Sequence, residues 1–190
     1  DAIIELLLKI FVKFGENVLI PIPTFFVYQH ATKIVGGNPI FVNRLDDFGL
    51  EVPRLLQKVT PEVKLIFIAN PNNPTANYVS REIIVKILNE VDCIVVVDEC
   101  YYEFCQETVI DLVDQYPNLV VLRSFSKSFG LAGLRVGYSI ANETIIDYLY
   151  RVANPFSVNA IALAAAVVAL IDIDYVNSNI EKICQEREIM

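Results

Sequence analysis

Two residues between positions 98 and 138 have side chains that can do chemistry together. Asp98 ends the apolar run CIVVVD, and Lys127 follows twenty-nine positions later in the turn SFSKSFG. A carboxylate at the end of a buried strand is partly desolvated, which is unfavourable without a cationic partner. The two residues therefore suggest either an ordinary ion pair or a ligand held between them, with one end that favours an anion and another that reacts with an amine.

Each of these residues also has a simpler interpretation on its own. An Asp after an apolar strand can bind a metal ion or cap a helix, and most lysines are solvated and take no part in chemistry. A lysine between Ser126 and Ser128, followed by Gly130, is less ordinary. Whether Asp98 and Lys127 act together depends on the elements that position them.

Short β-rich runs alternate with helical patterns along the first 140 residues, and helical patterns alone follow. Several predicted strands are continuously apolar, which indicates that both faces of the sheet are covered. Alternation with helices predicts βαβ units, so the predicted fold class is α/β, with three layers and a mostly parallel sheet flanked by helices. The predicted strands are 17–20, 39–43, 64–70, 93–98, 119–125 and 134–140, and the predicted helices are 1–14, 24–35, 51–59, 80–90, 108–115, 142–152, 157–171 and 175–189.

Polar residues follow three of the predicted strands at the point where each strand ends. KLIFIAN runs into PNNPT, CIVVVD into ECYYE, and LVVLRSF into SKSFG. Ligands of open α/β sheets gather at the carboxyl ends of the strands. The sequence therefore predicts a binding site at this edge, which receives Asn, Asp, Tyr, Ser and Lys side chains.

Composition excludes several classes of function. The net charge of −8, with no run of Lys or Arg, argues against binding of duplex nucleic acid. His30 is the only histidine, which argues against a His-rich metal site and a Ser-His-Asp triad. Neither GxGxxG nor GxxxxGK[ST] occurs, which disfavours a plain nucleotide-binding domain.

Cysteine usage and hydropathy bear on the compartment. The four cysteines form no CxxC pair, which is typical of reduced cysteines in an intracellular enzyme. The longest apolar run, 160–171, is shorter than the ~20 residues needed to span a bilayer, so a buried helix is expected and no membrane partner. We expect a cytoplasmic protein, although Asp1 opens directly into a helix pattern and the chain looks cut there, so a targeting segment would not be visible.

Pyridoxal 5′-phosphate fits the ligand that Asp98 and Lys127 suggest. Its aldehyde forms a Schiff base with a lysine, and an Asp that keeps its ring nitrogen protonated makes the ring a better electron sink. Its phosphate requires hydroxyls, backbone N–H groups, an arginine and preferably a helix N-terminus.

The motifs of the chain resemble the fold-type I, class I/II aminotransferases. NPNNPT (70–75), DECY (98–101) and SFSKSFGLAGLRVGY (124–138) carry this resemblance. PNNPT, DECYYEF, PNLVVLRSFSKSFGLAGLRVGY and NPFSVNAIALAAA are most similar to the histidinol-phosphate aminotransferases within that family. The resemblance covers essentially the whole chain, and it implies the pyridoxal-phosphate-binding large domain of a transferase.

The resemblance implies a role for each matching residue. Lys127 would bind the cofactor aldehyde and later move the proton, and Asp98 would pair with the ring nitrogen. The phenolic oxygen would be bound by Tyr101 and Asn73, and the ring would stack on Phe25, for which core packing is the alternative. Cys100 would pack near the other face of the cofactor ring, or it would only pack against other side chains of the protein. Arg135 could instead form a structural ion pair. The residues expected around the phosphate are Ser124, Ser126, Arg135, and Asp1 and Ala2 at the start of the first helix.

Departures from the family pattern concern the chain ends and one turn. Ala2 replaces a usual Glu, and Ala76 follows NPT where Gly is usual. We divide the chain into a cofactor-binding core, 1–152, and helices that lead toward a small domain, 153–190. The small-domain arginine for the substrate carboxylate and the tyrosine from a partner subunit lie outside the chain, so the isolated chain is expected to transaminate poorly.

The expected activity is transamination of histidinol phosphate with 2-oxoglutarate, which yields imidazole-acetol phosphate and glutamate in histidine biosynthesis. The partners are then a small-molecule amino donor and a 2-oxo acceptor, and a homodimer is expected for the full-length protein. Alternatives are an aromatic or other class I/II aminotransferase, a threonine-phosphate decarboxylase-like enzyme, or a non-catalytic fragment.

Overall fold

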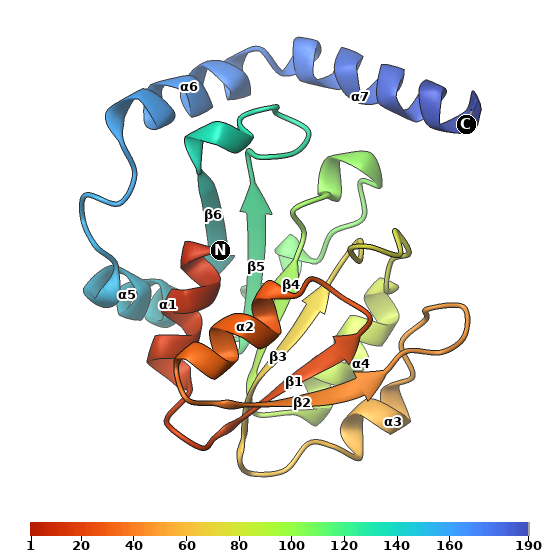
Figure 1. Cartoon of the computed structure of the whole chain (residues 1–190), viewed down its shortest axis with the longest axis vertical. Helices are drawn as coiled ribbons and strands as arrows, with labels where there is room; N and C mark the ends of the chain where they lie inside the picture. The colour runs from red at the N-terminus through yellow and green to blue at the C-terminus, as the bar shows by residue number, and fades with distance from the viewer. Residues whose placement is uncertain (190) are drawn as a thin grey trace.

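The computed structural model describes residues 1–189 and contains one six-stranded sheet (Figure 1). The strand order is β2–β1–β3–β4–β5–β6, with the first five strands parallel and β6 antiparallel to β5. This confirms the predicted α/β class with a mostly parallel sheet. The strands are β1 (Asn17–Ile22), β2 (Asn38–Asn43), β3 (Val63–Ala69), β4 (Ile94–Asp98), β5 (Leu119–Ser124) and β6 (Gly137–Ala141).

The central strands bury side chains on both faces of the sheet. Successive residues of a strand point to opposite sides, so Val95 and Val97 of β4 join one core cluster and Val96 joins the other. All three side chains are fully buried. The continuous apolar runs in the sequence are explained by this double coverage.

Helices form the two outer layers. Ile4, Leu8 and Ile145 lie in the core cluster of one face, and Ile84 and Ile87 lie in that of the other face. The first face is covered by α1 (Ala2–Phe11), α2 (Val27–Ile34) and α5 (Glu143–Val152), and the second by α3 (Val52–Leu56) and α4 (Arg81–Glu90).

Two further helices cross the carboxyl-end side of the sheet, α6 (Ala160–Ile171) and α7 (Ile173–Ile189) (Figure 1). The expectation that 160–171 forms a buried helix was wrong, because only Ala162 and Ala166 of α6 are buried, whereas Ile161, Val168 and Ile171 are exposed. Within residues 1–189 no single helix is long and apolar enough to cross a membrane. α6 and α7 together meet that test of length and composition, but they are bent by 78° at the break between them.

The first predicted helix is shorter than expected. It ends at Phe11 rather than residue 14, because Val12 is extended and buried and the Lys13 N–H donates to the Glu16 carboxylate over 2.7 Å. Gly15 lies in the turn that follows and has φ +83°.

The helices predicted at 24–35, 51–59 and 157–171 are shorter in the structure, where they span Val27–Ile34, Val52–Leu56 and Ala160–Ile171. Two further predicted elements differ for reasons that local contacts explain. Only a 3-10 turn, Ile110–Leu112, replaces the predicted helix at 108–115, because the Val109 N–H is taken by the Glu99 side chain. The last strand begins at Gly137 rather than residue 134, because the chain first forms a 3-10 turn and Arg135 then adopts left-handed φ 57°. The proposed division into 1–152 and 153–190 stays a prediction.

Candidate active site

Asp98 ends β4 and is almost completely buried, with 7% of its surface exposed. The Tyr28 hydroxyl donates to Asp98 Oδ2 over 2.6 Å, and the Cys100 N–H donates to Oδ1 over 3.1 Å. Both donors are neutral, and within residues 1–189 the carboxylate has no salt bridge. A buried carboxylate that is oriented but not neutralised favours a cationic ligand group beside it.

Tyr28 is a site residue that the sequence reasoning missed. It lies on α2 with 1% exposure and stacks on Phe67, with ring centroids 4.5 Å apart. Burial, and then the Asp98 carboxylate, raise the pKa of Tyr28 well above its ordinary value, so the phenol stays a donor. No local pattern signals it, because its partner Asp98 lies seventy residues away in the chain.

Lys127 lies exposed in the turn that follows β5, with its Nζ 5.3 Å from the centroid of the Tyr101 ring. Cys100 connects this lysine to Asp98. Burial raises the pKa of the Cys100 thiol and the Asp98 carboxylate raises it further, whereas the Lys127 ammonium lowers it in part. β4 and β5 are adjacent parallel strands, so Asp98 at the end of β4 and Lys127 in the turn after β5 lie at the same edge of the sheet.

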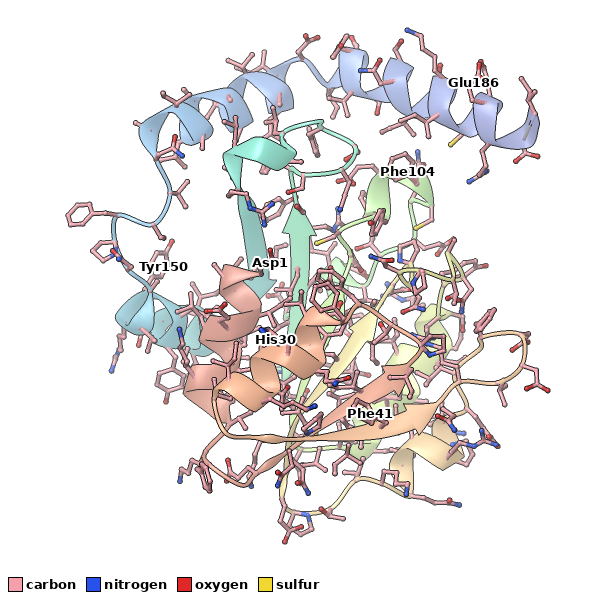
Figure 2. The ribbon with its side chains drawn as sticks, viewed as in Figure 1. Asp1, His30, Phe41, Phe104, Tyr150 and Glu186 are labelled. Atoms are coloured by element: carbon pink, nitrogen blue, oxygen red, sulfur yellow. The ribbon has the colours of Figure 1, made fainter. Side chains whose placement is uncertain are left out.

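A group suited to an anion forms where β5 ends and α1 begins. The Ser126 N–H donates to Ser124 Oγ over 3.0 Å. The exposed Arg135 guanidinium forms an ion pair of 2.6 Å with Asp1 Oδ2, which is the alternative role expected for it, and Asp1 lies at the start of α1 (Figure 2). In the described chain the Asp1 side chain makes no capping hydrogen bond to α1, so the first N–H groups of α1, which begin at Ala2, suit an anionic ligand.

The loops that carry Phe25 and Asn73 are held together by their neighbours. Thr24 Oγ1 donates to Asn72 Oδ1 over 2.8 Å, and Arg44 Nη2 donates to the same oxygen over 3.2 Å. Phe25 is half-buried, and its ring meets that of Tyr28 edge to face with centroids 5.7 Å apart. Phe25 therefore does pack against the core, beside the residue that orients Asp98.

The predicted site residues fit the chemistry of pyridoxal phosphate. The buried Asp98 carboxylate, which has no cation beside it within residues 1–189, matches the ring nitrogen, and the Lys127 amine matches the aldehyde. The phosphate is matched by two serines, an arginine and the N-terminus of α1. Across residues 1–189 no group of three or more His, Cys, Asp or Glu side chains is placed to hold a metal ion.

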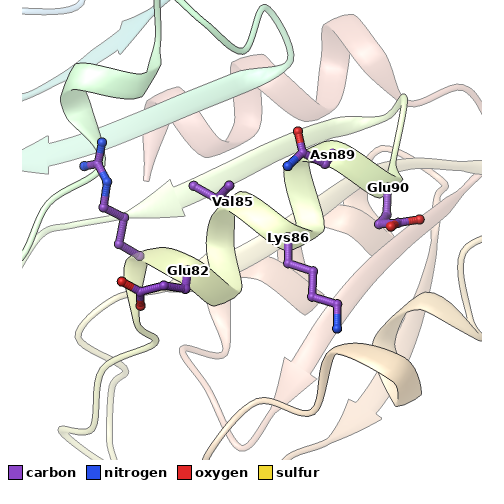
Figure 3. Close-up of a pocket in the computed structure, with 6 residues that line it drawn as sticks. Glu82, Val85, Lys86, Asn89 and Glu90 are labelled. Carbon is purple, nitrogen blue, oxygen red and sulfur yellow. The ribbon is translucent and has the colours of Figure 1, made fainter.

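A separate hollow lies on the surface of α4 (Figure 3). Its lining comes only from that helix, Arg81, Glu82, Val85, Lys86, Asn89 and Glu90, and includes none of the predicted site residues. Arg81 is already paired with Asp111 through two short hydrogen bonds. The sheet edge therefore remains the candidate active site.

Curated relatives and solved structures resemble the chain over its whole length. The histidinol-phosphate aminotransferase of Methanosarcina mazei is 40% identical over 190 residues, which are 100% of this chain and 52% of that protein. That of Dehalococcoides mccartyi strain BAV1 is 42% identical over 188 residues, 99% of this chain and 52% of the relative. The chain thus spans about half the length of the curated relatives it matches.

The crystal structure of histidinol-phosphate aminotransferase from Sinorhizobium meliloti in complex with pyridoxal-5′-phosphate is similar to this chain, with a TM-score of 0.92 and 28% sequence identity. The match covers 98% of this chain and 52% of the Sinorhizobium meliloti chain. The structure of the aromatic aminotransferase from Pyrococcus horikoshii has a TM-score of 0.87 and 28% sequence identity, and the match covers 99% of this chain and 54% of that chain. The family described as aminotransferase class I and II matches residues 1–190. With its motifs at the carboxyl edge of the expected sheet, this chain belongs to the class I and II aminotransferases.

Proposed function

We propose that this chain forms the cofactor-binding part of a pyridoxal-phosphate-dependent aminotransferase. Its family membership supports this proposal, as does the name of the relatives at 40–42% identity. The observation that carries it is the buried Asp98 carboxylate, which is held by neutral donors at the same sheet edge as the turn that carries Lys127.

When bound, pyridoxal phosphate supplies an aldehyde that takes up an amino group and a protonated ring that draws electrons from the substrate Cα. Lys127 would bind that aldehyde and carry the proton to and from Cα, since its amine is exposed beside the Tyr101 ring. Asp98 would keep the ring nitrogen protonated, and Tyr28 would hold Asp98 in place.

The remaining residues would bind and orient. We propose that Tyr101 and Asn73 donate to the phenolic oxygen and that Phe25 stacks on the ring. Together these residues would orient the ring relative to Lys127. The phosphate would be bound by Ser124, Ser126, Arg135 and the first N–H groups of α1 at Asp1 and Ala2.

For the substrates we propose histidinol phosphate and 2-oxoglutarate, converted to imidazole-acetol phosphate and glutamate. The names of the curated relatives support this pair. A second candidate, an aromatic aminotransferase, is favoured by the Pyrococcus horikoshii structure, whose 28% identity equals that of the Sinorhizobium meliloti enzyme. Turnover of histidinol phosphate against phenylalanine by the full-length protein separates the two.

Absorbance of the full-length protein after addition of the cofactor tests the proposed function. We expect a band in the wild type that is absent from Lys127→Ala. Lys33→Ala is the matched control, because Lys33 lies at the end of α2 and should leave the band unchanged. A wild-type protein without a band that depends on Lys127 refutes the proposal.

We further propose that the full-length protein is a cytoplasmic homodimer. The exposed apolar residues of α6 support the dimer, since unpaired apolar surface of this kind favours association. The four free cysteines support a reducing compartment. The oligomer is measured by light scattering of the full-length protein, and a monomer at micromolar concentration contradicts it.

A further inference from the structure

A second cluster of charged side chains lies directly behind the candidate site. Glu99 is completely buried and Arg123 is 7% exposed. Asp98 is paired with Leu122 in the parallel register of β4 and β5, so Glu99 and Arg123 come next to each other one residue later. Because side chains alternate along a strand, this pair projects from the opposite face to Asp98.

Glu99 and Arg123 each make several hydrogen bonds. Glu99 Oε2 accepts from Arg123 Nε over 2.9 Å and lies 2.7 Å from Arg123 Nη2. The same oxygen accepts from Thr108 Oγ1 over 2.8 Å, and Glu99 Oε1 accepts from the Val109 N–H over 2.9 Å. The Arg123 guanidinium also lies 3.5 Å from the centroid of the Tyr102 ring. The cluster therefore joins the ends of β4 and β5 to the segment that follows β4.

Three members of the cluster are direct chain neighbours of proposed site residues. Glu99 follows Asp98, Tyr102 follows Tyr101, and Arg123 precedes Ser124, as the sequence shows. A shift of a residue in this cluster would therefore also shift its chain neighbour, which belongs to the proposed site on the other face of the sheet.

A buried ion pair is weak evidence for a role in stability alone. Burial raises the pKa of Glu99, and its hydrogen bonds to Val109, Thr108 and Arg123 offset this in part. Apolar residues of similar volume often replace such a pair with no loss of stability. What apolar residues do not provide is the fixed, directional geometry of several short hydrogen bonds.

We propose that Glu99 and Arg123 are positioning residues, which set the distance between the Asp98 carboxylate and the turn that carries Ser124 and Lys127. This inference rests on the proposed function, because the distance matters only if one cofactor is held between these groups. Both residues lie on the opposite face of the sheet from Asp98 and are not among the residues proposed to bind that cofactor.

The decisive variant is the double substitution Glu99→Met with Arg123→Met in the full-length protein, with Asp111→Asn as the control for loss of an exposed ion pair. Thermal unfolding without cofactor reports whether the fold is kept. Equilibrium dialysis gives the dissociation constant of pyridoxal phosphate, and the pH midpoint of the Lys127-dependent absorbance band reports the electrostatic surroundings of the lysine.

We expect the double variant to unfold close to the wild-type temperature, to bind cofactor about tenfold to a hundredfold more weakly, and to shift the pH midpoint of the band. The Asp111→Asn control should match the wild type in unfolding temperature, cofactor affinity and pH midpoint. A folded double variant with wild-type affinity and midpoint overturns the inference. A wild type without the band refutes the proposed function instead, so the two failures are distinguishable.

If the double variant does not fold, Thr108→Val decides the question. It removes the hydroxyl that bonds both Glu99 and Arg123, but it leaves both charges and nearly the same volume in place. We expect a weaker cofactor affinity and a band midpoint shifted from that of the wild type. Unchanged affinity and midpoint overturn the inference.

Discussion

Replacement of Tyr28 by Phe removes the hydroxyl that donates to Asp98 and nothing else. The bond is 2.6 Å long and joins a phenol that is 1% exposed to a carboxylate that is 7% exposed. This length is typical of a hydrogen bond to an ionised acceptor. The Phe ring keeps the stack on Phe67, so the variant creates only a small void.

The expected fall in the free energy of unfolding follows from that geometry. A hydrogen bond to a charged group contributes about 1.5–3 kcal/mol to stability. Since both partners are buried and no salt bridge to Asp98 replaces the bond within residues 1–189, we expect the free energy of unfolding to fall by about 2 kcal/mol. This is roughly a thirtyfold change in the folding equilibrium.

Urea-induced unfolding without cofactor measures this difference. Tyr150→Phe is the matched control, because Tyr150 is 80% exposed and its loss of a hydroxyl should change stability by less than about 0.5 kcal/mol (Figure 2). A Tyr28→Phe variant that unfolds within about 0.5 kcal/mol of the wild type at neutral pH would show that the bond does not orient Asp98 as described.

The same variant has a pH signature. The pKa of Tyr28 is raised in the folded protein, so its contribution is complete below the unfolded value of about 10. Above that pH the unfolded phenol ionises and the folded one does not, so the wild type loses stability as pH rises. The advantage of the wild type over Tyr28→Phe should therefore shrink above about pH 10. A constant difference up to pH 11 contradicts this interpretation.

Three other outcomes can be measured directly. Borohydride reduction of the cofactor-loaded protein should attach the cofactor to Lys127, as peptide mass spectrometry would show, and attachment elsewhere contradicts the proposed role. Cys100 should react with iodoacetamide far more slowly in the folded than in the urea-unfolded protein at pH 8, because burial raises its pKa, and equal rates contradict that. Asp111→Asn should lower the free energy of unfolding by less than about 1 kcal/mol, because its ion pair with Arg81 is exposed, and a larger loss in urea unfolding would show an unrecognised structural role.

The sheet and its site edge were predictable because continuous apolar runs have few other solutions. The run before Asp98 can only be a strand covered on both faces, and the polar residues at its end then share an edge with those after β5. Local pattern was sufficient for this part of the fold.

Other features depend on contacts between segments far apart in the chain. The stretch 108–115 has a helical pattern, but its Val109 N–H donates to the side chain of Glu99, which no local pattern reveals. Tyr28 was missed for the same reason, since its partner Asp98 lies seventy residues away. Tertiary hydrogen bonds of this kind override or add to the local signal.

The protonation state of the cofactor ring tests the role of Asp98 most directly. Nitrogen-15 magnetic resonance of ring-labelled pyridoxal phosphate, bound to the full-length protein at pH 8, distinguishes a protonated from an unprotonated ring nitrogen. We predict a protonated nitrogen in the wild type and an unprotonated one in Asp98→Ala. An unprotonated nitrogen in the wild type would contradict the assignment of Asp98 as its partner.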